Sequence, residues 1–457
     1  MNNTGLESLS IAELSRHVAK RQLSAREVTV YFLERIARFD GALFGYNHPT
    51  PEAALESAAA LDNRLAAGEA VGPLAGIPLS IKDVADVAGL PATGASASRR
   101  GRVATLDAAV VRRLKDAGAI ILGKSNCHEL AFGGPSFDLP FPPARNPWEP
   151  SFFSGGSSSG SGVTVAAGLC LGSLATDTAG SIRLPSTLCG VVGLKPSRGA
   201  VPLDGISILA ASMDHVGPVA ATPGDCRILF HAMRGGDMPP PMEADGSFAG
   251  LRIGMPRHEW GVGPRLDQDV RAAWSAAADL VESCGGSVIE LDLDTLEDFH
   301  APGTIIMMRE VADAHAAAVR QSFSSYGEMF RGRALVGESI RDEDYRAACL
   351  MRDRLTARMT TALDQVDALL IPGALAPATP LGKVDKYYFM KDPIPNVVAN
   401  FTGHPALAFP SGLSRNGMPI GLQILGRMNS EGRLLEIAER FRQTRPEWSP
   451  RPPGYFI

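Results

Sequence analysis

The stretch Gly155–Ser186 reads GGSSSGSGVTVAAGLCLGSLATDTAGSIRLPS, and two clusters of glycine and serine dominate it. Glycine lets a substrate approach the main chain closely, and a serine hydroxyl becomes a nucleophile when a base activates it. No histidine lies within the stretch, so the base must come from another part of the chain. We therefore expect a serine-dependent site that combines this stretch with a distant residue.

Around this stretch, hydrophobic segments of strand length alternate with segments of helical periodicity. Isoleucine and leucine alternate with other residues in 77–82, which predicts a strand that ends at Lys82. Further strands are predicted at 119–122, 171–176, 191–194, 251–255, 288–291 and 368–371. Helices are predicted at 51–67, 107–117, 266–283 and 343–363, and two more begin at the capping boxes of Ser10 with Glu13 and Ser24 with Glu27. This alternation predicts an α/β fold, a large mixed β-sheet covered by helices on both faces.

The clearest break in the chain is Met238–Gly246 (MPPPMEADG). We interpret it as a loop that joins two halves of one fold, although a linker between domains would have the same composition. One domain then spans residues 1–457. Its N-terminal helices occupy about 8–67, its catalytic core about 70–235 and its C-terminal half about 250–457.

Composition and charge narrow the function classes. The chain has 457 residues and a net charge of -5, which gives no reason to expect nucleic acid or an anionic membrane as partner. Its six cysteines form no CxxC pair, as expected for reduced thiols in a cytoplasmic protein. The N-terminus lacks a secretory signal, and the apolar run 163–175 is shorter than a membrane span.

Two general motifs also fit parts of the serine-rich loop. Gly156–Gly160 (GSSSG) matches the G-x-S-x-G elbow of an α/β-hydrolase-type esterase, with Ser158 as nucleophile and His404 as a candidate base. That motif needs a strand directly before the turn, whereas Pro147–Ser154 is interrupted by proline. A phosphate-binding loop needs Gly-Lys followed by Ser or Thr, whereas valine follows the last glycine of GGSSSGSG.

The loop and its surroundings resemble the amidase signature family of serine hydrolases. The segments that carry this resemblance are GIPLSIKDVADVAG (Gly76–Gly89), GKSNCHELAFGG (Gly123–Gly134), ARNPW (Ala144–Trp148), GGSSSGSG and TDTAGSIRLPS (both within Gly155–Ser186), CGVVGLKPSRGAVP (Cys189–Pro202), DHVGPVA (Asp214–Ala220) and GHPALAFPSGLSRNGMPIGLQILG (Gly403–Gly426). They cover most of the chain. The resemblance implies the amidase signature fold and a hydrolase of C–N bonds in linear amides other than peptide bonds.

The family acts through a Ser-Ser-Lys triad and an acyl-enzyme. The matching positions are Lys82, Ser157 and Ser181, and their gaps of 75 (157 − 82) and 24 (181 − 157) residues match the family. Ser181 would be the nucleophile, and Ser157 would relay protons between it and Lys82. The resemblance also implies a cis peptide bond between Gly156 and Ser157.

Lys82 must be neutral to act as a base. An ordinary lysine, with a pKa of ~10.4, is almost entirely protonated at pH 7. The apolar neighbours Ile77, Leu79 and Ile81 would bury the amine at the strand end. Burial disfavours the charged form, so we expect a lowered pKa for Lys82.

An oxyanion needs hydrogen-bond donors, and the turn Thr178, Ala179, Gly180 and Ser181 is expected to supply them from its backbone. The family commonly has Gly-Gly before the nucleophile, whereas this chain has Ala179-Gly180. Residues expected to support the site are Gly156, Ser158, Thr176, Asp177 and Arg183. For the last two, a simple surface ion pair is the alternative.

The substrate is expected to be a small amide or carbamate. The segment GGPSFDLPFPPARNPW resembles free-standing bacterial amidases of broad specificity, including enzymes that act on anilides and carbamates (urethanases). Phe132, Gly133 and Gly134 are candidates for the substrate pocket, although ordinary core packing also explains the phenylalanine. The nine histidines are dispersed, and the adjacent Cys127, His128 and Glu129 cannot easily surround one ion, so no metal and no cofactor is expected.

Two rival functions and a homodimer remain open. The first rival is the glutaminase (A) subunit of a tRNA-dependent amidotransferase, which would need partner subunits. Such subunits typically carry a YDGVRYG-like segment, which this sequence lacks. The second is a non-catalytic binding protein, against which the presence of all three triad residues argues.

Overall fold

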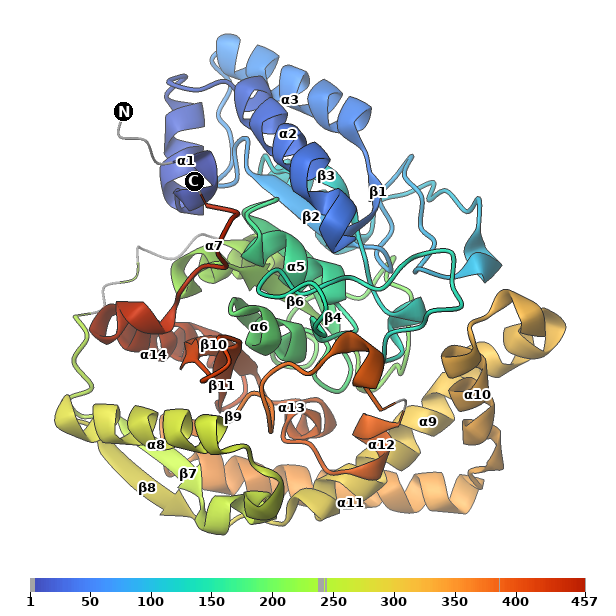
Figure 1. Cartoon of the computed structure of the whole chain (residues 1–457), viewed down its shortest axis with the longest axis vertical. Coiled ribbons are helices and arrows are strands. Elements are labelled where there is room, and N and C mark those ends of the chain that lie inside the picture. The colour runs from blue at the N-terminus through green and yellow to red at the C-terminus, as the bar shows by residue number, and fades with distance from the viewer. Residues whose placement is uncertain (1–4, 237–241, 243–244, 386, 457) are drawn as a thin grey trace.

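The computed structural model describes residues 5–236, 242, 245–385 and 387–456 (Figure 1). Its strands are β1 (Tyr46–Pro49), β2 (Pro78–Lys82), β3 (Ile120–Ser125), β4 (Gly172–Asp177), β5 (Val192–Lys195), β6 (His215–Ala220), β7 (Arg252–Pro256), β8 (Ser287–Leu291), β9 (Ala368–Pro372), β10 (Ala406–Leu413) and β11 (Pro419–Leu425). Its helices are α1 (Ile11–Ala19), α2 (Ala25–Leu43), α3 (Pro51–Ala66), α4 (Ala109–Asp116), α5 (Ser159–Ala166), α6 (Arg183–Cys189), α7 (Pro223–Arg234), α8 (Gln268–Ser283), α9 (Leu296–Gln321), α10 (Glu328–Val336), α11 (Asp342–Leu363), α12 (Tyr388–Lys391), α13 (Asn396–Thr402) and α14 (Glu431–Thr444).

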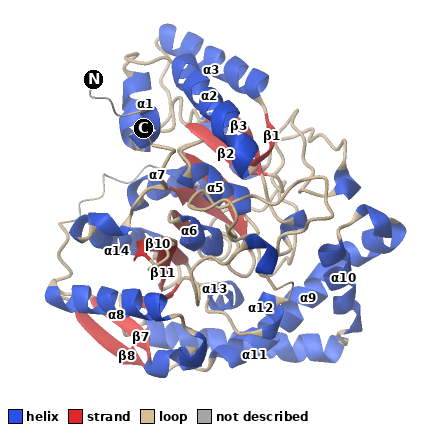
Figure 2. Ribbon diagram, viewed as in Figure 1, coloured by secondary structure: helices blue, strands red, loops and turns tan. Residues whose placement is uncertain are grey.

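The strands form one sheet in the order β1-β3-β2-β4-β6-β5-β10-β11-β9-β7-β8. The sheet is mixed, because β2 pairs in parallel with β3 and β4, and β7 with β8 and β9, whereas the other pairs are antiparallel. Helices lie on both of its faces (Figure 2), with α5 and α6 on one side of the central strands and α7 on the other. The predicted α/β fold with a mixed, helix-covered sheet is therefore confirmed.

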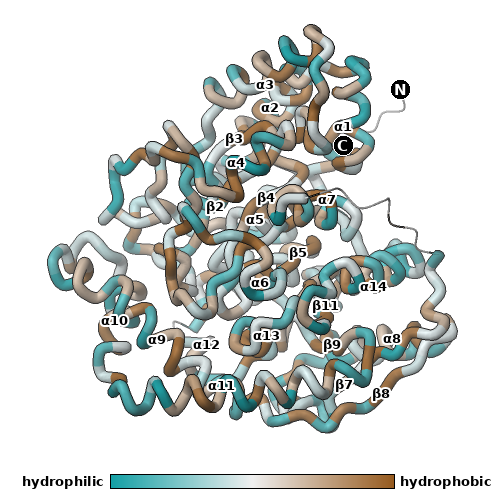
Figure 3. Tube along the Cα trace, turned by 180° about the vertical axis from the view of Figure 1, so that it is seen from behind, coloured by the Kyte–Doolittle hydropathy of each residue, from teal (hydrophilic) through white to brown (hydrophobic). Residues whose placement is uncertain are grey.

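The central strands β2 and β4 are buried on both faces, although polar residues such as Ser80, Ser173 and Thr176 lie among their apolar ones. Every residue of β2 and of β4 is buried. In Figure 3, hydrophobic (brown) segments occur in helices as well as in strands, and hydrophilic (teal) residues occur along α11. No helix among the described residues is long and apolar enough to cross a membrane.

Local signals located most of the elements correctly. Both capping boxes are present: the Ser10 and Ser24 hydroxyls accept from the backbone N–H groups of Glu13 and Glu27, and the serine backbone N–H groups donate to the glutamate carboxylates in return. The strand expected at 119–122 is longer and runs over Ile120–Ser125. Of the expected loop Met238–Gly246, residues 238–241 and 243–244 lie outside the described residues.

Some elements lacked a clear local signal. Strands β6 and β10 contain Pro218 and Pro410, and β10 also contains Gly412, which are residues that normally argue against a central strand. Both pair on two sides, β6 with β4 and β5, and β10 with β5 and β11. Tertiary packing therefore overrides local composition at these strands.

Candidate active site

The C-terminal end of β2 delivers Lys82 to the serine-rich loop. Its Nζ lies 2.9 Å from Ser157 Oγ and 2.7 Å from Thr176 Oγ1. Ser157 precedes α5, and Thr176 lies on β4, which pairs with β2 in parallel. Lys82 and Ser157 are both fully buried. The structure thus brings the Lys82 amine into contact with two hydroxyls, those of Ser157 and Thr176, that lie far from it in the sequence.

Burial changes the acidity of Lys82. Loss of hydration lowers the pKa of its ammonium group to about 8, and electrostatic interactions with Cys127, Asp177 and Asp214 only partly oppose this effect. A measurable fraction of the amine is therefore neutral at pH 7. A neutral amine can donate one N–H to Thr176 Oγ1 and accept the Ser157 proton on its lone pair.

This lowered pKa predicts the pH dependence of turnover. If Lys82 acts as a base, its neutral amine is the active form, and kcat/KM is then expected to rise about tenfold per pH unit in the acidic range and to level off above a pH of about 8. The measurement is kcat/KM for one amide substrate between pH 5.5 and 9.5, with folding checked at each pH. A profile that falls across pH 7–9 would contradict a neutral lysine as base.

Ser181 lies in the turn between β4 and α6. It is partly exposed, and it lines a cavity together with Gly156. The backbone N–H of Ser158 donates to Ser181 O at 3.1 Å, which joins the two serine-bearing loops. The bond between Gly156 and Ser157 is cis, as the resemblance implies. Ser181 is therefore partly accessible at a cavity, whereas Lys82 is fully buried.

A buried ion pair holds this turn in place. Arg183 and Asp177 are both fully buried, with Nη2 3.0 Å from Oδ1, so they are not a surface pair. The Asp177 carboxylate also accepts the N–H of Gly180 at 2.7 Å and of Ile182 at 3.0 Å. The Arg183 guanidinium holds the pKa of Asp177 well below its usual range. A fixed charge pair thus determines the backbone path through Ser181.

The N–H groups of the turn are not equivalent. The Gly180 N–H donates a hydrogen bond to the Asp177 carboxylate. The backbone N–H groups of Thr178, Ala179 and Ser181 have no acceptor within the described residues. The Thr178 hydroxyl donates to Asp214 Oδ1 at 2.6 Å, which fixes the first residue of the turn. Three of the four predicted backbone donors are therefore available to a ligand.

The cavity at Ser181 is narrow, with a volume of about 30 Å³. It is lined by Ala131, Phe132, Gly133, Gly156, Thr178, Ala179, Ser181, Leu184, Leu209, Met307, Tyr388, Ile394 and Asn396. Phe132 and Gly133 were expected here. Gly134 was also expected, but it lies outside this lining and donates its N–H to His128 Nδ1 at 2.7 Å. A second cavity of about 340 Å³ shares four lining residues with the first: Leu184, Tyr388, Ile394 and Asn396.

His128 is a site residue that the sequence did not identify. Its ring stacks on Phe153 and packs so closely on Gly156 that any Cβ at position 156 would overlap it. Burial lowers the pKa of His128 to about 3, so the ring is neutral and supports the loop by shape. In the sequence, His128 stands out only as a member of Cys127–Glu129, three adjacent residues that cannot easily surround one metal ion. The described residues contain no group of three or more His, Cys, Asp or Glu side chains placed to hold a metal ion.

The alternative nucleophile has a different environment. Ser158 Oγ donates to the backbone oxygen of Thr176 at 3.0 Å, and the proline-interrupted segment before it forms only isolated bridges. His404, its candidate base, lies 3.1 Å from Thr360 Oγ1. This arrangement lacks the strand and the histidine that an elbow needs.

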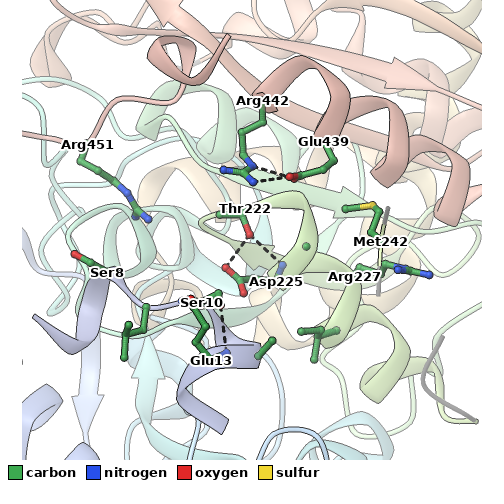
Figure 4. A pocket seen from close by; sticks show the side chains of 14 residues that line it. Ser8, Ser10, Glu13, Thr222, Asp225, Arg227, Met242, Glu439, Arg442 and Arg451 are labelled. Carbon is green, nitrogen blue, oxygen red and sulfur yellow. Dashed lines mark hydrogen bonds and ion pairs between the residues drawn. The ribbon is translucent and has the colours of Figure 1, made fainter. Parts of the chain in front are cut away.

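A larger cavity of about 630 Å³ lies between α1, α7 and α14 (Figure 4). Asp225 accepts bonds there from the Thr222 hydroxyl and the Ile11 N–H, and Arg442 pairs with Glu439. None of the residues of the serine-lysine cluster lines it. The volume of a cavity therefore does not indicate where the serine-lysine cluster lies.

Comparison with known proteins places the chain in a family. A model of the family Amidase matches residues 27–435. The chain is 34% identical to the A subunit of the glutamyl-tRNA(Gln) amidotransferase of Synechococcus sp. (strain CC9311), over 98% of this chain and 100% of that protein. A crystal structure of an amidase superposes with a TM-score of 0.87 at 32% identity, over 95% of this chain and 99% of that one. The native peptide amidase of Stenotrophomonas maltophilia superposes with a TM-score of 0.81 at 28% identity, over 98% and 99% of the two chains. The chain belongs to the amidase (amidase signature) family.

Proposed function

We propose that this protein hydrolyses the C–N bond of carboxylic amides through an acyl-enzyme on Ser181. The observation that carries the proposal is the contact of 2.9 Å between Ser157 Oγ and the buried Lys82 amine, whose pKa is lowered to about 8, beside a reachable Ser181. A desolvated lysine next to a serine relay is an arrangement suited to activating a hydroxyl nucleophile.

In acylation, neutral Lys82 takes the Ser157 proton while Ser157 takes the proton of Ser181. Ser181 Oγ attacks the carbonyl carbon, and the negative charge moves to the carbonyl oxygen, which the free N–H groups of the 178–181 turn stabilise. The tetrahedral intermediate collapses as the C–N bond breaks. The proton returns from Lys82 through Ser157 to the leaving amine.

Deacylation repeats these steps with water. The same relay removes a proton from the water as it attacks the Ser181 ester. The collapse of the second tetrahedral intermediate releases the carboxylic acid and returns a proton to Ser181. The net reaction consumes one water and regenerates neutral Lys82, as general acid–base catalysis requires.

The cavity wall supports an apolar amide or carbamate as the substrate. All the described residues that line the cavity at Ser181 are neutral, and most are apolar. Of the residues that line the larger second cavity, Lys383, Asp385 and Asp392 are charged and the others are neutral. An aryl or aliphatic acyl group would lose little hydration energy at the inner wall, whereas a zwitterion would lose much.

A second candidate function is the glutaminase component of a tRNA-dependent amidotransferase. The full-length similarity to amidotransferase A subunits favours it over a free-standing amidase. The chemistry at Ser181 would be the same, with the side-chain amide of glutamine as substrate and partner subunits as the receiver of ammonia. The missing YDGVRYG-like segment and the neutral inner wall favour the first candidate.

An assay of the isolated chain distinguishes the two candidates. We expect kcat/KM for a short-chain acyl p-nitroanilide, or for a carbamate, to exceed that for glutamine by at least about 100-fold, because burying an unpaired charge at a neutral wall costs several kcal/mol. The measurement is release of nitroaniline or ammonia at pH 8. A preference for glutamine would instead establish the second candidate.

A further inference from the structure

The side chain of Asn396 differs from the other residues around the cavity. It is 2% exposed, and its amide nitrogen Nδ2 has no hydrogen-bond partner within the described part of the chain. It lines the cavity at Ser181 and also the second cavity beside it. Buried polar groups are nearly always hydrogen-bonded, so a donor without a partner at a cavity wall points to a ligand.

The position of Asn396 relative to the nucleophile turn is close. A Cβ built on Gly180, the residue before Ser181, would lie 2.6 Å from Asn396 Cβ and 3.2 Å from its Nδ2. The asparagine side chain therefore lies directly over the turn. It also explains why position 180 is glycine, since any side chain there would collide with it.

The frame that holds the turn also holds this asparagine. Arg183 Nη2 donates to Asn396 O at 2.8 Å, and the same guanidinium pairs with Asp177, which accepts the Gly180 N–H. The turn and the start of α13 are thus bound to one buried ion pair. A donor fixed in this way is preorganised, and electrostatic catalysis depends on such preorganisation.

The size of the cavity limits what Nδ2 can bind. A volume of about 30 Å³ has room for only a few water-sized groups. Ser181, Thr178, Ala179 and Asn396 all face this one small space. An oxygen atom placed there for attack by Ser181 is therefore close to the amide of Asn396 as well.

We propose that Asn396 Nδ2 donates a hydrogen bond to the carbonyl oxygen of the scissile amide and to the oxyanion that forms from it. This inference rests on the proposed function of Ser181. The Gly180 N–H is not available to a ligand because it donates to Asp177. The asparagine side chain, which lies over Gly180, supplies a hydrogen-bond donor at this point of the turn. Asn396 is then a catalytic residue contributed by the C-terminal half of the chain.

The test compares Asn396→Ala and Asn396→Asp with Ile394→Ala. The aspartate keeps the shape of the side chain but has no N–H, and Ile394 lines the same two cavities without a polar group. We expect both Asn396 variants to lose about 10²–10³-fold in kcat with KM changed less than about threefold, because a lost oxyanion donor acts on the transition state. Ile394→Ala should change mainly KM.

A second measurement follows the tetrahedral state itself. A trifluoromethyl ketone analogue of the substrate forms an oxyanion on the serine, so its Ki should rise in Asn396→Ala by the same factor as kcat/KM falls. The Ki of the carboxylic acid product, which forms no such adduct, should change far less. If kcat of the Asn396 variants falls by less than about fivefold, or if only KM changes, the assignment is overturned. Failure of the underlying function would look different, because the chain would then retain activity after Ser181→Ala alone.

Discussion

Replacing Ser181 by alanine is expected to lower kcat by about 10⁴-fold or more and to abolish covalent labelling by a fluorophosphonate. The reason is that the acyl-enzyme cannot form without Oγ. The side chain of Ser181 contributes little to the stability of the fold. Ser181 is partly exposed, and the bond from Ser158 N–H to Ser181 O is to the backbone, which alanine keeps. Losses of this order are typical when the nucleophile of a serine hydrolase is removed.

Ser159→Ala is the matched control. Its hydroxyl is buried at the start of α5, directly after Ser157 and Ser158, and has no hydrogen-bond partner among the described residues, so its loss should leave turnover and labelling unchanged. Intact-mass spectrometry after labelling locates the adduct. An adduct that persists in Ser181→Ala and disappears in Ser158→Ala would support the elbow motif and refute the proposed nucleophile.

Lys82→Met is the second change with a large expected effect, a fall in kcat of about 10²–10⁴-fold. Methionine has a similar length and suits a fully buried position, so the variant should fold. It has no basic nitrogen, and the proton of Ser157 therefore has no acceptor, which removes general-base assistance. The remaining activity should lose the rise with pH up to about 8 that the lowered pKa of Lys82 predicts.

Lys82→Arg separates a basic role from a structural one. Arginine keeps the positive charge and the N–H donors but stays protonated at every accessible pH. If Lys82 acts as the base, this variant is as inactive as Lys82→Met. If Lys82 only holds Ser157 and Thr176 by hydrogen bonds, Lys82→Arg retains most of the turnover. Circular dichroism and Tm for both variants exclude unfolding as the cause.

The sequence predicted the architecture because hydrophobic segments of strand length alternate with segments of helical periodicity, and because two helix starts carry capping boxes. It also singled out Lys82 and Ser157, which the structure brings within 2.9 Å of each other. It missed His128 and Asn396, since a lone histidine or asparagine has no local pattern that distinguishes site from core. Their roles depend on what packs against them, a Gly156 backbone in one case and Gly180 in the other.

By itself, the sequence determined the family, the sheet with helices on both faces, and the residue types available for chemistry. Only the tertiary structure decided that the Lys82 amine is desolvated to the extent that lowers its pKa to about 8. Only the tertiary structure decided, too, that the Gly180 N–H is bonded to Asp177 while the N–H groups of its neighbours are available. It also decided that α13, more than 200 positions after Ser181, reaches the same cavity. The physical reason is that acidity and free hydrogen-bonding capacity depend on local dielectric and on partners in space, and chain order specifies neither.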